Sequence, residues 1–156
     1  MSARLAGEPF AAEVELARFV AGLTGAGAVA SFLGIARART AEGEPVERLV
    51  LDHHPRLTQR SLDEIAEAAL RRFGLDSVRI VHRFGAVAPG ETIVFVAAAA
   101  EHRRAAFEAA DYMMDRLKTD AVFWKREDRA SGSRWIEPRD EDYSDRERWS
   151  EAPCPE

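Results

Sequence analysis

The sequence predicts a single α+β domain with a mainly antiparallel sheet, two long helices and a short N-terminal helix. Helix-period apolar patterns alternate with short strand-like runs, turn residues separate them, and no repeat or linker interrupts the chain. With 156 residues, 46% hydrophobic and 31% charged, the composition is that of a globular protein with one core. We expect the domain to cover residues 1–140 and an acidic, mobile tail to cover residues 141–156.

The first half of the chain predicts a helix, two strands and a long second helix. Residues 11–23 place apolar side chains near one helical face and are followed by glycines. Residues 28–36 form an apolar run typical of a buried strand, and residues 46–52 alternate like its hairpin partner across a polar loop. Pro55 and Gly74 favour the two ends of the next helix.

The second half predicts two more strands, over residues 78–84 and 92–100, joined by an Ala-Pro-Gly-Glu turn at 88–91. Residues 102–118 predict the other long helix, and one or two short strands follow it before the tail. The positions of this helix expected to face the core are Phe107, Ala110, Met114 and Leu117.

The charge of the chain is unevenly distributed and favours a small anionic ligand. The formal net charge is −5, and ten acidic against five basic residues lie from Glu127 to the end. Residues 102–126 instead carry six Lys and Arg against four Asp and Glu. Duplex nucleic acid needs a broader basic face, so we expect no nucleic-acid partner.

Two further classes are excluded on the sequence. The longest apolar run, residues 93–100, is too short to span a bilayer, so we expect no membrane association. The N-terminal residues lack the basic start and apolar stretch of a secretory signal, which predicts a cytoplasmic location.

Cysteine and histidine usage predicts neither a metal nor a cofactor. The single cysteine, Cys154, lies between two prolines, so it forms no internal disulfide or thiolate cage and lacks surroundings that would activate it. His53, His54 and His82 show no metal-ligand spacing and are interpreted as structural or exposed. Phosphate-binding and dinucleotide-binding glycine motifs are absent.

Lys118 and Lys125 are the leading candidates for chemistry. Taken separately, each favours a structural role: Lys118 falls in the last turn of a helix, where the dipole favours a cation, and Lys125 has the pattern of an exposed strand residue. A catalytic role requires that the two ammonium groups converge. Convergence and burial would lower the pKa of one lysine and make it a usable base or nucleophile near neutral pH.

A second cationic group lies at the start of the same predicted helix. Backbone N–H groups of a helix N-terminus beside His102 and Arg103 favour a phosphate or carboxylate, although a solvated first turn fits equally well. Arg103 and Lys118 are separated by about 22 Å of helix. If both act on one ligand, a second subunit supplies one of them. Arg37, just after a predicted strand, could also clamp an anion.

Short motifs along the chain carry a family resemblance. In order, the motifs are Gly27-Ala28-Val29, Phe32-x-Gly34-x-x-Arg37, His82-Arg83-x-Gly85, Pro89-Gly90-Glu91, His102-Arg103-x-x-Ala106-Phe107, Asp115-x-x-Lys118 and Phe123-Trp124-Lys125-Arg126-Glu127. Together they resemble the large, catalytic subunits of molybdopterin synthase over about residues 8–140. The chain departs from the family pattern at three positions, Ile35, His54 and Val122. At the position of Val122 the family usually has proline.

The resemblance implies an α/β hammerhead fold and a sulfur transfer that builds the dithiolene of molybdopterin from cyclic pyranopterin monophosphate (precursor Z). Sulfur would arrive as a thiocarboxylate on the C-terminal Gly-Gly of a small ubiquitin-like subunit. The assembly implied is a homodimer that becomes a heterotetramer with two small subunits, in molybdenum cofactor biosynthesis. The alternative is a non-catalytic module that docks the tail of a ubiquitin-like protein.

The resemblance also implies roles for individual residues. Lys118 and Lys125 correspond to the catalytic lysines of the family. The residues implied to bind or line the substrate are Arg37, His102, Arg103, Arg139, Phe32, Met114 and Arg126. The family's dimer would let His102 and Arg103 serve the site of the neighbouring chain.

Overall fold

A computed structural model describes residues 1–150 of the chain, which form two four-stranded sheets and four helices. The first sheet has the order β1-β4-β6-β2. Its strands are β1 (Ser2–Ala6), β4 (Ser77–Arg83), β6 (Thr92–Ala100) and β2 (Ala28–Ile35). The pair β1 and β4 is parallel, and the other pairs are antiparallel, so the predicted α+β class with mainly antiparallel strands is confirmed.

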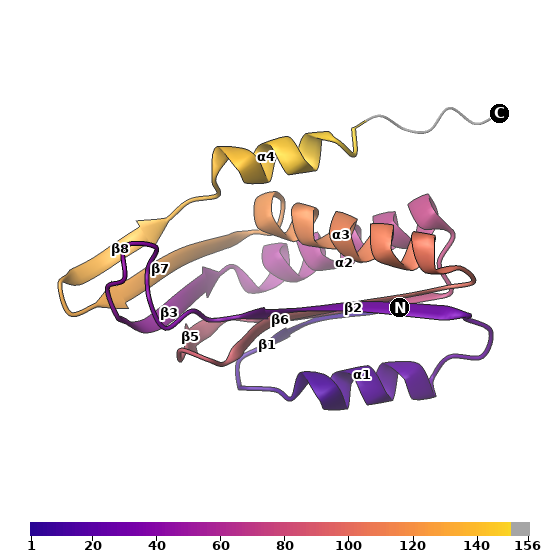
Figure 1. Ribbon diagram of the computed structural model, residues 1–156, viewed down its shortest axis with the longest axis horizontal. Helices are drawn as coiled ribbons and strands as arrows, with labels where there is room; N and C mark the ends of the chain where they lie inside the picture. The colour runs from indigo at the N-terminus through magenta and orange to yellow at the C-terminus, as the bar shows by residue number, and fades with distance from the viewer. Residues whose placement is uncertain (151–156) are drawn as a thin grey trace.

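Strand β6 is buried on both faces because helices cover both sides of the first sheet. Val94, Val96 and Ala98 pack in one core cluster, and Phe95 and Ala97 pack in another. The helices α2 (Pro55–Phe73) and α3 (Arg103–Thr119) lie over one face, and α1 (Ala12–Ala21) lies under the other (Figure 1). This double coverage explains the continuous apolar run of β6. The prediction of a buried strand over residues 28–36 was wrong: β2 lies at the edge of the sheet, and most of its residues are exposed.

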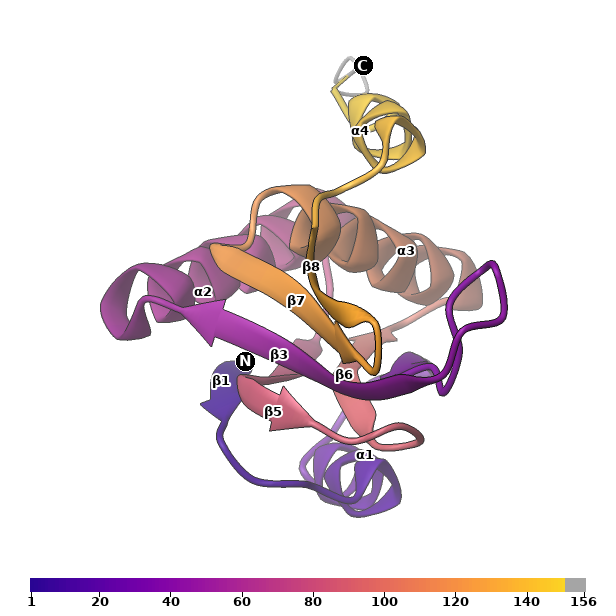
Figure 2. The same cartoon turned by 90° about the vertical axis from the view of Figure 1, so that its left-hand side faces the viewer.

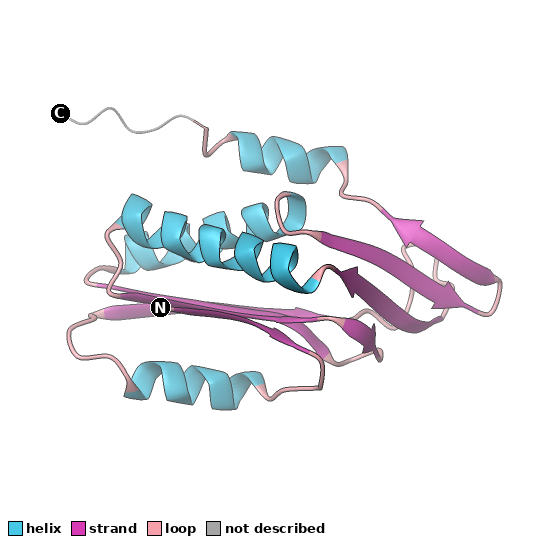
Figure 3. Cartoon of the chain, turned by 180° about the vertical axis from the view of Figure 1, so that it is seen from behind, coloured by secondary structure: helices cyan, strands magenta, loops and turns pink. Residues whose placement is uncertain are grey.

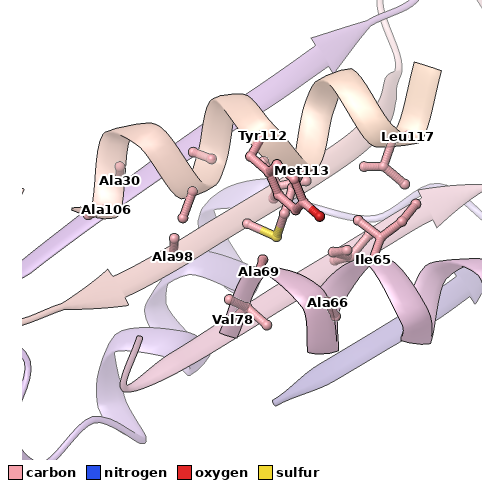
Figure 4. Close-up of a cluster of buried hydrophobic side chains, with 14 of the residues drawn as sticks. Ala30, Ile65, Ala66, Ala69, Val78, Ala98, Ala106, Tyr112, Met113 and Leu117 are labelled. Carbon is pink, nitrogen blue, oxygen red and sulfur yellow. The ribbon is translucent and has the colours of Figure 1, made fainter. Parts of the chain in front are cut away.

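The larger core lies between α2, α3 and the first sheet. Small residues of α3, including Ala106 and Ala109, allow the helix to approach β6 closely. The larger Met113 of the same helix packs in the same core cluster (Figure 4). Phe107 is 65% exposed, so its assignment to the core stripe was wrong. The residues of α3 that face the core are shifted around the helix by less than one turn from the predicted set. The reason is that the alanines, and not the Phe107 ring, fit against the sheet.

The ends of α2 agree with the sequence prediction. Pro55 is in the first turn, the His54 ring accepts a hydrogen bond from the Leu57 N–H at 3.3 Å, and Gly74 ends the helix with φ of 58°. Proline lacks the N–H that a first turn leaves unpaired, and glycine adopts the left-handed conformation without strain.

The second sheet has the order β5-β3-β7-β8 and extends from one end of the first (Figure 2). Its strands are β3 (Val46–His53), β5 (Gly85–Val87), β7 (Phe123–Arg129) and β8 (Gly132–Ile136). The prediction that residues 46–52 form a hairpin with residues 28–36 was wrong. β2 pairs with β6, whereas β3 pairs with β5 and β7. Local alternation shows that a segment is a strand but does not select its partner.

The sequence did not predict β1 or the last helix, α4 (Asp140–Glu147). Helix α4 falls in the predicted acidic tail and lies beside α3 (Figures 1 and 3). The following Trp149 packs edge-on against Phe73 and Tyr112, and its indole N–H donates to Asp115 at 2.6 Å. Aromatic pairs of this geometry each add about 0.5–1.5 kcal/mol to simple burial, which accounts for helical order there. Cys154 lies outside the described residues.

In the part of the chain that the structure describes, no helix is long and apolar enough to cross a membrane. Residues 1–150 also bring together no group of three His, Cys, Asp or Glu side chains that could hold a metal ion.

Candidate active site

The two lysines lie on consecutive elements joined by a short, well-anchored turn. Lys118 is exposed in the last turn of α3, and Lys125 is half-buried near the start of β7. Between them, the Val122 carbonyl accepts a hydrogen bond from Thr58 Oγ1 at 2.5 Å, and the Val122 N–H donates to Ser61 Oγ at 3.3 Å. The second bond requires an N–H, which a proline at this position would lack. Helix α2 therefore fixes the turn that sets the two lysines.

Lys125 has the most strongly perturbed environment among the candidate catalytic residues. It pairs with the fully buried Leu51 of β3, so its side chain shares a face with the core. Burial and then the nearby charge of Lys118 lower the pKa of Lys125 from 10.5 to about 8, and Asp142 of α4 opposes this shift. The two ammonium groups therefore lie close enough for their charges to interact, and a fraction of Lys125 is neutral near pH 7.

A buried histidine lies close enough to Lys125 for the lysine charge to affect it. The His82 ring stacks on Phe123, with centroids 4.2 Å apart, and Nδ1 lies 2.8 Å from the Arg83 carbonyl. Burial lowers the pKa of His82 to about 4, and the charge of Lys125 adds to this effect. The imidazole is therefore neutral at pH 7 and adds no positive charge near Lys125.

Arg37, Met114 and Arg139 lie toward the lysine end of the fold. Arg37 is exposed just beyond β2, and the preceding Ala36 packs against Leu51, which pairs with Lys125. Met114 is half-buried one turn before Lys118. Arg139 caps α4: its N–H donates to Asp142 at 2.8 Å, and its guanidinium lies 3.9 Å from the same carboxylate. The Asp142 charge acts to raise the pKa of Lys125, so Asp142 lies near that lysine. Arg139, beside Asp142, therefore lies at the lysine end of the fold.

Arg126 and Phe32 lie apart from the lysines. Side chains alternate along a strand, so Arg126 points to the face of the second sheet opposite Lys125. There its guanidinium donates to Asp128 at 2.9 Å and lies over the Trp135 ring. Phe32 is 44% exposed on β2, at the edge of the first sheet. Neither side chain is among the groups whose charges shift the pKa of Lys125, which are Lys118 and Asp142.

His102 and Arg103 lie at the opposite end of α3, as their separation from Lys118 predicted. They line an open hollow of about 640 Å³ with Gly27 and Phe107. A Cβ at Gly27 would come within 2.4 Å of the Glu101 carbonyl oxygen, so only glycine lets the start of β2 lie against this helix end. In one chain the cationic groups therefore form two separate sites.

The sequence reasoning missed the contributions of His82 and Asp142. The sequence predicts that His82 is structural or exposed and that Asp142 lies in a mobile tail. The alternating strand pattern around His82 could have indicated its burial. No local signal indicates that Asp142 returns to Lys125, because that depends on the packing of α4.

The fold and the two lysines define a class of small α+β proteins in which a lysine of lowered pKa lies near a second lysine. The family model described as "MoaE protein" matches residues 5–120. A molybdopterin synthase catalytic subunit from Caulobacter vibrioides is 48% identical over 97% of this chain and 99% of its own length. The chain belongs to the MoaE family, the molybdopterin synthase catalytic subunits.

Other relatives support the same family assignment. A molybdopterin synthase catalytic subunit from Pseudomonas aeruginosa is 46% identical over 81% of this chain and 84% of its own length. The solved structure of a molybdopterin biosynthesis MoaE protein from Burkholderia ambifaria has a TM-score of 0.81 and 37% identity, covering 96% of this chain and 97% of that one. The similarity to the Burkholderia structure covers nearly the whole chain, and the similarity to the Pseudomonas subunit covers about four fifths of it.

Proposed function

We propose that this protein is the catalytic subunit of a molybdopterin synthase. It transfers sulfur to cyclic pyranopterin monophosphate from the C-terminal thiocarboxylate of a small ubiquitin-like subunit, which leaves as a carboxylate. The observation that carries the proposal is the convergence of Lys118 and Lys125, with the pKa of Lys125 lowered to about 8, in a chain of this family. The proposal keeps the cytoplasmic location predicted from the sequence.

The two lysines take different roles in this proposal. Lys118 is exposed, so it can hold the thiocarboxylate of an incoming tail by charge. After the sulfur attacks the pterin and forms a thioester, the neutral Lys118 amine takes the glycyl group as a transient amide and releases the thiolate on the pterin; water then hydrolyses the amide to the carboxylate. Lys125 is half-buried and has a lowered pKa, which suits it to stabilise charge on the pterin intermediates and to transfer protons near neutral pH. Arg37 and Arg139 supply further positive charge for the phosphate, and Met114 lines the substrate. Phe32 would line a substrate only at a site that the second copy helps to form.

The experiment is a conversion assay with the purified chain, its thiocarboxylated small subunit and cyclic pyranopterin monophosphate. Formation of the dithiolene product supports the synthase. Tight binding of the small subunit without any product would support the alternative, a non-catalytic docking module. Inclusion of a carboxylate-terminated small subunit as the control ensures that the sulfur in the product comes from the thiocarboxylate.

We further propose that the assembly is a homodimer carrying two small subunits, in which His102 and Arg103 of one copy complete the lysine site of the other. The 22 Å that separates Arg103 from Lys118 along α3 supports this arrangement. The strand β2 also lies at a sheet edge and exposes Phe32, Leu33 and Ile35, which a second copy would cover. Arg126 would contact substrate only if the assembly brings its face of the sheet to a site.

Mixing two inactive variants tests the shared site. A dimer of one Lys118→Ala chain and one Arg103→Ala chain contains one site in which both residues are intact. We expect an equal mixture, after subunit exchange, to recover about a quarter of the wild-type rate, because half of the dimers are mixed and each has one complete site. The control is each variant alone. A mixture no more active than its components would contradict the shared site.

The pKa values of the two lysines can be measured directly, because Lys118 and Lys125 are the only lysines in the chain. After reductive methylation with ¹³C, we expect one lysine signal to titrate near pH 8. Lys118→Met removes a like charge and should raise the Lys125 midpoint, whereas Asp142→Asn removes an opposite charge and should lower it. A wild-type Lys125 midpoint near 10.5 would contradict the convergence of the two lysines.

A further inference from the structure

A buried arginine lies at the end of β4, outside the proposed catalytic groups. Arg83 is 2% exposed, and its two terminal nitrogens donate to Glu91 Oε2 at 3.1 Å and to the Ala86 carbonyl at 2.9 Å. Its Nε has no hydrogen-bond partner among the described residues. A guanidinium is strongly disfavoured in a buried place unless a carboxylate pairs with it. The Glu91 carboxylate is therefore required beside Arg83.

Glu91 in turn fixes the tight turn between β5 and β6. The same carboxylate oxygen accepts a hydrogen bond from the Ala88 N–H at 3.0 Å, and the Glu91 N–H donates to the Ala88 carbonyl at 3.1 Å. Gly90 completes the turn with φ of 85°, a conformation that favours glycine. One carboxylate therefore joins the end of β4 to this turn.

The turn holds the residue that precedes Arg37. The Gly90 N–H donates to the Ala36 carbonyl at 2.8 Å, and the Ala36 N–H donates to the Glu91 carbonyl at 2.9 Å. Ala36 is buried against Leu51, the residue that pairs with Lys125. Hydrogen bonds to the turn hold the backbone of Ala36 on one side, and packing against Leu51 holds the residue on the other. Together they set the point from which Arg37 extends.

We propose that the Arg83–Glu91 ion pair is a positioning device for Arg37. It fixes the 88–91 turn, the turn fixes Ala36, and Ala36 fixes the point from which the exposed guanidinium reaches the substrate anion. Arg83 and Glu91 touch no substrate and act only through Arg37. The inference rests on the proposed function, since it takes Arg37 to bind the substrate phosphate.

Glu91→Gln in the full complex tests the device. Glutamine keeps the size of the side chain but removes the charge that holds Arg83. We expect the KM for the pterin to rise about tenfold, the effect of misplacing one charge-assisted hydrogen bond, with kcat within about twofold. The matched control is Glu15→Gln, which removes another carboxylate from a β4 arginine: Glu15 accepts from Arg79 at 3.0 Å on the α1 side of the sheet. We expect this control to change stability but not the KM.

A double-mutant cycle separates positioning from general support of the fold. In an Arg37→Ala background, Glu91→Gln should raise the KM no further, because the group that it positions is gone. Additive effects of the two substitutions would overturn the proposal. If Glu91→Gln does not fold, as judged by circular dichroism, Glu91→Asp keeps the charge, shortens the arm by one methylene and carries the same cycle.

The outcomes also separate this inference from the proposed function. An Arg37→Ala variant with an unchanged KM would overturn the role of Arg37 as an anion-binding residue, and the positioning device with it. An Arg37→Ala variant with a raised KM, beside Glu91 variants with a wild-type KM, would overturn the positioning device alone.

Discussion

Lys125→Ala is expected to lower the rate of molybdopterin formation by about 10²- to 10⁴-fold, the range that a positioned acid or base contributes. The reason is that the half-buried Lys125 ammonium has a pKa lowered to about 8. It can therefore exchange a proton near neutral pH and also stabilise negative charge on a pterin intermediate. Single-turnover assays with saturating small subunit would measure the chemical step apart from partner release.

Lys125→Arg distinguishes the two roles. Arginine keeps a positive charge but is always protonated, so it can stabilise an anion and cannot transfer a proton. Recovery of much of the lost rate in Lys125→Arg would assign Lys125 to charge stabilisation, and no recovery would assign it to proton transfer. Full activity of Lys125→Ala would contradict a catalytic role for this residue.

Lys118→Ala is expected to cause a loss of similar size for a different reason. Lys118 is exposed at the end of α3, where the helix dipole favours a cation and an incoming anionic tail can reach it. Without it, the thiocarboxylate loses its ionic partner and its possible acceptor amine. We expect both kcat and the apparent affinity for the small subunit to fall.

A covalent adduct can be assigned to one residue because the chain has only two lysines. If the small subunit's terminal glycine forms an amide with this chain, peptide mass spectrometry should find it at Lys118. Lys118→Ala should abolish the adduct, and Lys125→Ala should leave it detectable. Arg71→Ala, on an exposed face of α2, is a suitable control for nonspecific loss of positive charge. Wild-type turnover by Lys118→Ala would refute the proposed role of Lys118.

The candidate site was predictable only in part. Lys118 and Lys125 stand out in the sequence because they bracket an apolar segment, but the sequence left open whether their ammonium groups meet. The lowered pKa of Lys125 depends on Lys118, at the end of a helix, on Asp142, in a later helix, and on burial against β3. Each of these three effects depends on how separate helices and strands pack against one another. No local sequence pattern encodes that packing.

The fold divides in the same way. Pro55 and Gly74 act within their own turns, so the ends of α2 followed from the sequence. The apolar run over residues 92–100 likewise predicted a strand, and β6 has those limits. The partner of β3 and the exposure of Phe107 did not follow, because periodicity reports which residues share a face and not what covers that face.

By itself the sequence determined the α+β class, the limits of the long helices and the two lysines, all of which depend on residues near one another in the chain. The separation of about 22 Å between Arg103 and Lys118 also followed from residue counting, since helical rise is constant. Tertiary structure alone decided the division into two sheets, the return of α4 to Lys125 and the link from Arg83 through Glu91 to Arg37. These depend on which distant surfaces pack together, and that choice is made by the shape and burial of the whole core.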